Sequence, residues 1–446
     1  MREFSFPWSE GFFKGLRPNS TVPKNSPYLY EAYGVRVGSF GLESPVSIDT
    51  FETGADPTMK FPDIAWPMPQ IIKTSIGTFI VDSTDLRSAN SVYLLAVVLP
   101  GLSNTLNQQY HVADFGTYQF WTNGSTCILR DYLSVWQIYP AALIPMSVCN
   151  YKGQLILGGM GTTTNKNVVV WSGIGESDLD VLCSTDLGVL ATDYSTQKNT
   201  SGNKRMKWSG QVYTVKELGK YVMIYGEDGI SAMVGVSDPA PTFGHIDLKD
   251  FGIMNRDAVG GDDKGHVFVD NSGWVWSVDT ELNFKRLGYR EYVDALIPPI
   301  PPTRIVVSFD PELRDFYIAS GVTGNGAPLG CLLLADGLSS IAHVPTSIIR
   351  DTNVYKGQII GPRYVIGDEL PYITTEVFDM RTRGIKQVTA LEVGTQSDYV
   401  VVALDYRYNS DDAWRVSTYK HMSRGGLVFP QIAGVEFRIR MKASIT

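Results

Sequence analysis

The segment His266-Val-Phe-Val-Asp-Asn-Ser-Gly-Trp-Val-Trp-Ser-Val278 holds the local pattern that decides the fold class. Two short, mostly β-branched and aromatic runs flank the polar group Asp270-Asn-Ser-Gly273, and such a group between two strand-like runs is a hairpin signal. The segment therefore predicts a β-hairpin. Because an isolated hairpin is too small to bury its own apolar faces, this one must pack among other small sheets.

The same pattern of strand, polar turn and returning strand recurs along residues 66–370. The other predicted pairs are Ile71–Lys73 with Phe79–Val81, Tyr118–Trp121 with Thr126–Leu129, Tyr221–Tyr225 with Ile230–Val234, Ile305–Phe309 with Asp315–Ala319, and Cys331–Leu334 with Leu338–Ala342. A blade repeat of about 40–50 residues is the nearest template. A radial array lets each sheet bury both faces and leaves only short edges. We therefore expect an all-β fold in which residues 66–370 form a β-propeller of about six or seven blades with degenerate repeats.

The N-terminal residues 1–65 are rich in proline, glycine and aromatic side chains and show little alternation. The aromatic residues nearest the start are Phe4, Phe6, Trp8, Phe12 and Phe13. Aromatic side chains so dense on an irregular segment need burial against another surface. We expect an extended arm that packs either on the platform of its own chain or on a neighbouring subunit.

Residues 371–446 have longer segments with better alternation. The predicted strands are Lys386–Gly394, Tyr399–Tyr408, Trp414–Met422 and Gly434–Lys442. Arg438 and Arg440 alternate with apolar residues, so one face of the last strand is predicted to be buried while the other presents arginines. These arginines could pair with acidic groups of a neighbouring subunit, or they could be solvated on an edge strand. We expect a C-terminal β-sandwich that serves oligomerisation.

The composition agrees with a β-rich chain that makes subunit contacts. Its 43 Gly and 24 Pro suit tight turns, and its 23 Tyr, 19 Phe and 9 Trp favour strands. Charged residues make up 19%, below the usual share of about 25%, which suggests that other subunits cover much of the surface. The net charge of −8 disfavours a protein that grips nucleic acid, because that function needs clustered Lys and Arg. The best helix candidate is short and lies near Lys249–Asn255.

Residues that commonly form metal or nucleophile sites are sparse. The four cysteines, Cys127, Cys149, Cys183 and Cys331, include no C-x-x-C pair, so we expect reduced, mostly buried thiols and neither a metal nor a cofactor. The motifs G-x-S-x-G, G-x-x-x-x-G-K-[ST] and H-E-x-x-H are absent, but a Ser–His–Asp triad assembled from distant residues remains open. The longest apolar stretch, Tyr93–Leu102, contains Pro100 and Gly101, so we expect no membrane span and no signal peptide.

Two carbohydrate-related alternatives remain open. A propeller glycosidase or depolymerase needs two carboxylates facing a sugar, and the candidates in polar loops are Glu176, Asp178, Asp180, Asp262 and Asp263. A carbohydrate-binding scaffold would use exposed aromatic residues, with Trp66, Trp121, Trp136 and Trp208 as candidates against an ordinary role in core packing. The segment Asp270–Trp276 resembles half of a sialidase-type Asp box, which in those families is a turn staple away from the active site. We expect a protein without enzymatic activity.

Several features, taken in chain order, resemble one family. After the aromatic arm comes a blade with an apolar strand, a short polar turn and a return strand at Lys220–Met233, and then a strand-turn-strand ending in a basic Gly segment at His266–Gly288. A Phe-Asp-x-x-x-x-x-Phe-x-Ile hairpin follows at Phe309–Ile318. The chain closes with Arg424-Gly-Gly and Gly434-Val-Glu-Phe-Arg-Ile-Arg440. In this order the sequence is similar to the ring-forming propeller proteins of short-tailed bacteriophages, called tail stabilisation, tail hub or nozzle proteins.

This resemblance implies a structural virion protein of the tail, assembled in the host cytoplasm. It implies a homo-oligomeric ring, most often of six copies, that lies beneath the portal and adaptor proteins and carries fibres, a spike or a tip. Exiting DNA would make transient, non-specific contact with the channel, and the acidic balance fits a wall that holds phosphate off. The assembly interface expected for this role comprises Phe4, Phe6, Trp8, Phe12, Phe13, Arg424, Arg438 and Arg440.

Overall fold

The computed structural model describes most of the propeller and of the C-terminal part of the chain. The described residues are 14–38, 41–43, 70–81, 85–89, 95–102, 109–116, 118–130, 133–139, 144–161, 165–172, 201–236, 242–296, 304–310, 313–321, 331–335, 338–342, 371–394, 397 and 399–443. Outside them lie the aromatic residues of the arm, Phe4, Phe6, Trp8, Phe12 and Phe13. The first two residues of the apolar stretch Tyr93–Leu102 also lie outside them.

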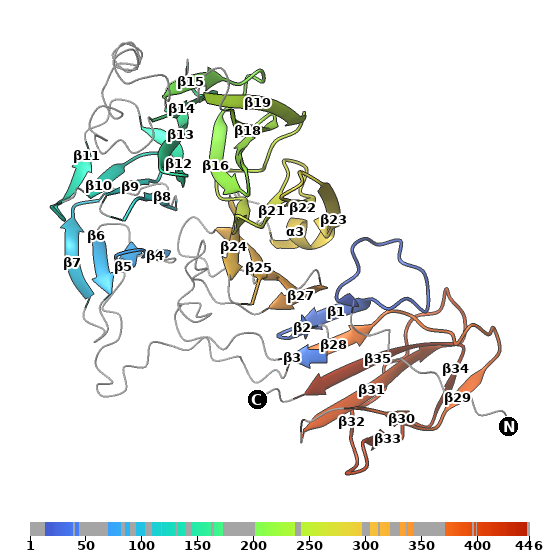
Figure 1. Cartoon of the computed structure of the whole chain (residues 1–446). Coiled ribbons are helices and arrows are strands. Elements are labelled where there is room, and N and C mark those ends of the chain that lie inside the picture. The colour runs from blue at the N-terminus through green and yellow to red at the C-terminus, as the bar shows by residue number, and fades with distance from the viewer. Residues whose placement is uncertain are drawn as a thin grey trace.

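Six antiparallel four-stranded units follow one another in the described chain and surround a common centre (Figure 1). Blade 1 contains β4 (Gln70–Thr74), β5 (Gly77–Val81), β6 (Asp85–Ala89) and β7 (Leu95–Pro100); blade 2 contains β8 (His111–Asp114), β9 (Gln119–Thr122), β10 (Cys127–Arg130) and β11 (Trp136–Tyr139); blade 3 contains β12 (Pro145–Tyr151), β13 (Gln154–Met160), β14 (Val168–Trp171) and β15 (Gly202–Arg205). Blade 4 contains β16 (Val212–Leu218), β17 (Tyr221–Gly226), β18 (Ile230–Val236) and β19 (Thr242–Lys249); blade 5 contains β20 (Val259–Asp262), β21 (Gly265–Val269), β22 (Val275–Asp279) and β23 (Phe284–Gly288); blade 6 contains β24 (Arg304–Asp310), β25 (Asp315–Gly321), β26 (Cys331–Ala335) and β27 (Leu338–Ala342). The all-β propeller predicted from the sequence is confirmed.

The first strand of each blade faces the neighbouring blades. From blade 2 to blade 6, the strands β8, β12, β16, β20 and β24 lie side by side in that order. Two glycines fall at these contacts: a Cβ on Gly158 would lie 2.7 Å from a methyl group of Val215, and one on Gly260 would lie 2.7 Å from the Val307 carbonyl oxygen. Glycine is needed at both places because only a residue without a side chain lets adjacent blades approach so closely.

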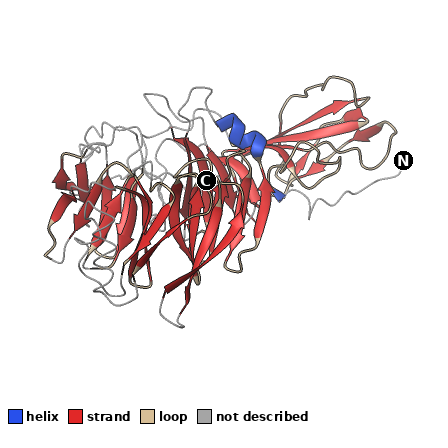
Figure 2. Ribbon diagram, turned by 90° about the horizontal axis from the view of Figure 1, so that it is seen from above, coloured by secondary structure: helices blue, strands red, loops and turns tan. Residues whose placement is uncertain are grey.

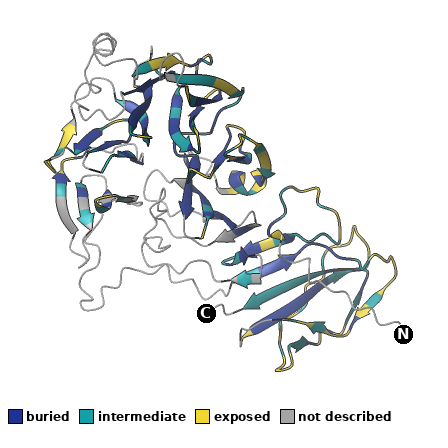
Figure 3. Ribbon diagram, viewed as in Figure 1, coloured by how far each residue is buried: buried dark blue, intermediate teal, exposed yellow. Residues whose placement is uncertain are grey.

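The apolar faces of the blades form separate cores between neighbouring sheets. One core joins Phe120 and Leu129 of blade 2 to Leu157 of blade 3, and another joins Ile224 of blade 4 to Trp171 of blade 3. Figure 3 shows the buried residues concentrated in these strands. Each sheet therefore hides its faces against its neighbours, as the hairpin pattern required.

The hairpin at residues 266–278 forms as predicted, and Asp270 holds its turn. The Asp270 carboxylate accepts hydrogen bonds from the backbone N–H of Ser272 at 2.8 Å and of Trp274 at 2.9 Å, and from Trp276 Nε1 at 2.7 Å. Asp270 is buried. The likeness to an Asp box thus corresponds to a turn staple, because all three donors belong to the same hairpin.

The sheet of blade 6 continues, through strand pairing, into the C-terminal part of the structure. The N-terminal strand β1 (Leu29–Tyr33) pairs in parallel with β27 and antiparallel with β28 (Tyr372–Thr375). Beyond β28 the same sheet adds β35 (Glu436–Ala443), β31 (Val400–Arg407) and β32 (Lys420–His421), so nine strands form one sheet. Figure 1 shows β1 and the short ribbon of β2 (Arg36–Gly38) and β3 (Gly41–Glu43) between the propeller and this part. The described part of the N-terminal arm is therefore built into its own chain as a sheet strand.

Two short ribbons cover one face of the C-terminal strands. They are β29 (Lys386–Val388) with β34 (Ile432–Gly434), and β30 (Leu391–Glu392) with β33 (Leu427–Val428). Leu404 and Phe437 of the large sheet pack against Val388, while Val400 and Val402 pack against Val428. The C-terminal part is thus a two-layer β structure, which we call the C-terminal module (residues 371–443).

The helix predicted near Lys249–Asn255 is wrong. Lys249 ends β19, and the next residues form no helix because neighbouring strands use their backbone groups: Ile253 N–H donates to the Gly226 carbonyl and Met254 N–H to the Val269 carbonyl. The helix α3 (Arg290–Leu296) was not predicted, and it packs on β25 and β26 of blade 6. Figure 2 shows a blue helix beside the red strands. Its Val293 is fully buried in the core of blades 5 and 6.

The predicted strand Trp414–Met422 is shorter than expected. Regular pairing is limited to β32, and Arg415 adds an isolated bridge to Tyr406. Between these points the Ser417 hydroxyl accepts a hydrogen bond from the Leu404 N–H at 2.8 Å. A side chain there occupies the N–H that would otherwise pair with the backbone of a neighbouring strand. The prediction Lys386–Gly394 likewise divides into β29 and β30, which pair with different strands.

Candidate functional site

The last strand, β35, alternates between an apolar face and a cationic face. Phe437 and Ile439 point into the cores beneath the large sheet. Arg438, Arg440 and Lys442 lie on the opposite face and are half-buried. Because side chains of a strand alternate between faces, the predicted separation of apolar and basic residues is present.

Aromatic rings and arginines interleave on this face. The guanidinium carbon of Arg438 lies 4.3 Å from the ring centroid of Tyr30 and 4.5 Å from that of Trp414. The guanidinium carbon of Arg17 lies 4.9 Å from the ring centroid of Tyr30, and that of Arg407 lies 4.6 Å from the ring centroid of Trp414. We call these five residues the arginine–aromatic stack. Cation–π contacts of this kind stabilise by about 0.5–2 kcal/mol each, depending on how far the cation is desolvated.

Carboxylates of the same chain neutralise the outer arginines of the stack. Arg407 Nη2 lies 2.6 Å from the Glu436 carboxylate, and Arg17 Nη1 lies 3.3 Å from that of Glu376. Lys24 and Ser410 also bind Glu436. Burial alone would raise the pKa of the Glu436 carboxyl, but these donors lower it to about 2.

The two arginines predicted as interface residues on β35 have different partners. Arg440 forms a two-point contact with Asp405 of the adjacent strand, at 2.8 Å and 2.9 Å, and its guanidinium lies 4.9 Å from the Tyr419 ring centroid. Arg438 donates a hydrogen bond to no acceptor in the described chain, and its Nε is buried. Burial lowers the pKa of Arg438, while Asp405 helps to raise that of Arg440 against a desolvation penalty. The third predicted residue, Arg424, is exposed in the β32–β33 connection.

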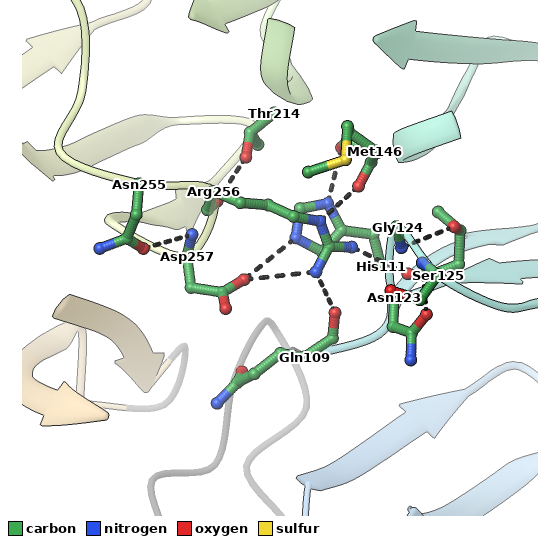
Figure 4. Close-up of polar contacts among 12 residues, drawn as sticks. Gln109, His111, Asn123, Gly124, Ser125, Met146, Thr214, Asn255, Arg256 and Asp257 are labelled. Carbon is green, nitrogen blue, oxygen red and sulfur yellow. Dashed lines mark hydrogen bonds and ion pairs between the residues drawn. The ribbon is translucent and has the colours of Figure 1, made fainter. Parts of the chain in front are cut away.

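A second polar cluster lies at the centre of the propeller, where the sequence analysis named no residue (Figure 4). Arg256 precedes β20 and is 4% exposed. Its guanidinium donates to the backbone carbonyls of Gln109, Thr122 and Met146, the Thr122 contact being 2.8 Å. One side chain on the way into blade 5 therefore binds blades 2 and 3.

The backbone beside Arg256 reaches two further blades. The Thr214 hydroxyl of blade 4 donates to the Arg256 carbonyl at 2.5 Å, and Val307 N–H of blade 6 donates to the Asp257 carbonyl at 2.9 Å. The Asp257 carboxylate lies 3.5 Å from Arg256 Nη1. We call Arg256 and Asp257 with these partners the axial network. Because it saturates carbonyls at the inner ends of several blades, it acts as a brace across the propeller centre.

The axial network brings together Ser147, His111 and Asp257, the residue types of a hydrolase triad. His111 Nδ1 lies 2.6 Å from the Ser147 hydroxyl, and His111 Nε2 lies 3.6 Å from the Asp257 carboxylate. Ser147, however, is fully buried, and its oxygen already accepts the Val215 N–H at 3.0 Å. A nucleophile needs access to its substrate, so the geometry suits a brace between blades better than catalysis.

The carboxylates proposed for a glycosidase do not form a described pair. Glu176, Asp178 and Asp180 lie outside the described residues. Asp262 binds Arg314 at 2.8 Å; burial would raise the pKa of its carboxyl, but Arg314 and the Lys264 N–H lower it below its usual value. A general acid needs the opposite shift, so Asp262 is suited to an ion pair between blades 5 and 6. Asp263 is exposed, and its charge contributes, after burial, to a raised pKa of Glu217.

The tryptophans proposed for sugar stacking are mostly packing residues. Trp121 is fully buried and packs against Phe79, and Trp136 packs against both rings. Trp208 is half-buried and donates its Nε1–H to Ser231 at 3.2 Å. Trp66 lies outside the described residues.

Cysteine and metal chemistry find little support in the part of the chain that is described. Cys127 and Cys149 are free thiols, and burial raises the pKa of both, that of Cys127 to about 12. Within the same residues, no three His, Cys, Asp or Glu side chains gather as metal ligands would. No described helix has the length and apolar character needed to cross a membrane.

Comparisons with known proteins return structures alone. No protein-family model matches the sequence, and no curated protein matches it. Among solved structures, the chain is similar to Raptor from Chaetomium thermophilum (TM-score 0.35, 8% identity, 55% of this chain and 22% of that one). It is also similar to the WD40 domain of Neurospora crassa Pan2 (0.35, 9%, 70% and 87%) and to BamB from Moraxella catarrhalis (0.33, 11%, 83% and 95%). The chain thus spans about a fifth of Raptor.

Because these identities and TM-scores are low, the fold is assigned from the sheet topology of the chain itself and not from these similarities. The chain is a β-propeller protein with a C-terminal β module fused to its sixth blade.

Proposed function

We propose that this protein is a structural component of a bacteriophage tail, built as a homo-oligomeric ring around the DNA exit channel and carrying fibres or a tip. The class of protein comes from the sequence resemblance to tail hub and nozzle proteins. The observation that carries the proposal furthest is the nine-stranded sheet, which joins blade 6, the N-terminal strand and the C-terminal module. Such a sheet makes propeller and module one stiff body, as a ring subunit under load requires.

The axial network supports a particular arrangement of the channel. Arg256, 4% exposed, and Asp257, 2% exposed, occupy the propeller centre together with three carbonyls from blades 2 and 3. Duplex DNA would not pass a centre filled in this way. We therefore place the channel between copies, at the axis of the ring, with each propeller as a solid wall element.

The test is the mass and shape of the purified full-length chain. Mass photometry should find a discrete ring, near 296 kDa for six copies of 49.3 kDa, either alone or after addition of tail partners. Negative-stain images should show an open centre with propellers around it. A chain that stays monomeric with its partners and cleaves a surface polysaccharide would contradict the proposal and favour a depolymerase. Specific retention on a polysaccharide without cleavage would favour a carbohydrate-binding scaffold.

A further inference from the structure

The two parts of the chain carry opposite net charge. Residues 371–446 contain ten Lys and Arg against eight Asp and Glu, a net charge of +2. The first 370 residues therefore contain 28 Lys and Arg against 38 Asp and Glu, a net charge of −10. An acidic propeller and a basic module in one chain are complementary when copies meet head to tail.

Two cations on the arginine–aromatic face form no ion pair with a carboxylate within the described chain, although the charge of Glu376 acts on one of them from a longer distance. They are Arg438 and Lys442, which lie on the same face of β35, about 13 Å apart at the usual rise of a strand. Lys442 contacts the rings of Tyr372 and Tyr419 at 5.8 Å and 5.5 Å. Arg440, which lies between them, is already paired with Asp405. The face therefore offers two cations without an ion-pair partner among the described residues, at a fixed spacing.

Arg438 is the stronger recognition element of the two. Its guanidinium contacts two rings, which fix its position before any partner arrives, and its buried Nε has no hydrogen-bond partner in the described chain. A planar guanidinium matches a carboxylate through two parallel hydrogen bonds. A carboxylate from outside the chain would meet the exposed part of this half-buried side chain rather than its buried Nε.

We propose that Arg438 and Lys442 receive carboxylates from the acidic propeller of a second copy of this chain. This inference rests on the proposed ring. A contact of the face with its own copy across a two-fold axis would set cations against cations, so the contact is head to tail. Contacts between two different surfaces of one subunit generate closed rings when the rotation closes.

The experiment compares assembly of three full-length proteins by mass photometry across a dilution series. The double variant Arg438→Gln with Lys442→Gln should weaken assembly by roughly a hundredfold, at about tenfold for each lost charge contact. The control Arg381→Gln with Arg383→Gln removes the same charge from exposed positions of the same module and should assemble like the parent chain. Raising the salt concentration should weaken the parent ring and leave the double variant little changed.

The outcomes separate this inference from the proposed function. A parent ring that the double variant forms equally well overturns the inference and leaves the ring standing. A parent chain that never self-associates, with or without tail partners, overturns both. If the double variant keeps the ring but loses affinity for duplex DNA, the cations serve a polyanion and the inference is wrong. If the double variant unfolds early, Lys442→Gln alone decides: it must weaken assembly severalfold, and unchanged assembly overturns the inference.

Discussion

Arg256 at the propeller centre and Arg438 on the C-terminal module show two opposite uses of one side chain. Arg256 is 4% exposed, binds three carbonyls and lies beside Asp257. Arg438 lies between two rings and donates no hydrogen bond within the described chain. The first arginine is saturated and supports the fold. The second forms no ion pair within the described chain, and we propose that it binds a carboxylate of a second copy.

The largest expected effect is at the propeller centre. Arg256→Ala would leave Asp257 without its ion pair and several buried carbonyls without donors, so we expect a loss of about 3–5 kcal/mol in the free energy of unfolding. Chemical denaturation of the full-length chain measures it. As a control, Arg290→Ala removes an exposed pair with Asp294 at 3.5 Å and should cost less than about 0.5 kcal/mol. Similar losses in the free energy of unfolding for the two variants would contradict the role of Arg256 as a brace of the propeller.

Replacing Asp270 is expected to lower the free energy of unfolding by less than replacing Arg256. Asp270 binds groups within one hairpin, whereas Arg256 connects several blades. Asp270→Ala removes the acceptor of three hydrogen bonds and should destabilise by about 2–3 kcal/mol. Tryptophan fluorescence during denaturation reports it, because Trp274 and Trp276 are donors. The matched change Asp250→Ala lies at an exposed position and should be nearly neutral. An Asp270 variant as stable as this control would rule out the staple.

Acid should weaken the module through Glu436. Its carboxyl has a pKa near 2 in the folded chain and an ordinary pKa of 4.5, so folding favours the ionised form. The stabilisation is therefore complete above pH 4.5 and is lost as the pH falls from there toward 2, by about 1–2 kcal/mol after allowance for solvent screening. Glu436→Gln should flatten unfolding free energy against pH in this window, whereas the exposed Glu392→Gln should leave the slope unchanged. Equal slopes in all three proteins would contradict this assignment.

The smallest effect on stability is expected at Arg438. Arg438→Gln removes two cation–π contacts but also a half-buried charge that forms no ion pair in the described chain, so the net loss should be below about 1 kcal/mol. The measurement is the same denaturation used for Arg256, and a loss of similar size there would remove the distinction between the two arginines. Arg407→Gln is the internal reference, because it deprives Glu436 of a partner and should cost more.

The propeller could be predicted from local pattern because its units are local. Each hairpin needs two apolar runs and a turn residue such as Asp270, and all of these lie within about a dozen residues. The two faces of the last strand could likewise be predicted, because Arg438 and Arg440 alternate with apolar neighbours. What the pattern did not contain was the partner of each arginine: Asp405 is 35 residues from Arg440, and Tyr30 is hundreds of residues from Arg438.

The axial network was missed for the same reason. Its only local signal was the opposite charges of Arg256 and Asp257 directly before an apolar strand, a place where solvated residues are also common. Its acceptors, such as the Gln109 carbonyl, are backbone atoms more than a hundred residues away and leave no trace in residue type. The failed helix at Lys249–Asn255 has a related cause, since distant strands use that backbone.

The amino-acid sequence by itself determined the all-β class, the blade hairpins and the two faces of the last strand, because strand alternation and turn chemistry act over a few residues. Only the packed structure decided that β1 joins blade 6 to the C-terminal module, that Arg256 closes the propeller centre and that Arg438 forms no ion pair among the described residues. These outcomes depend on which distant groups satisfy a buried charge or an open strand edge, and that is settled only when the sheets have packed.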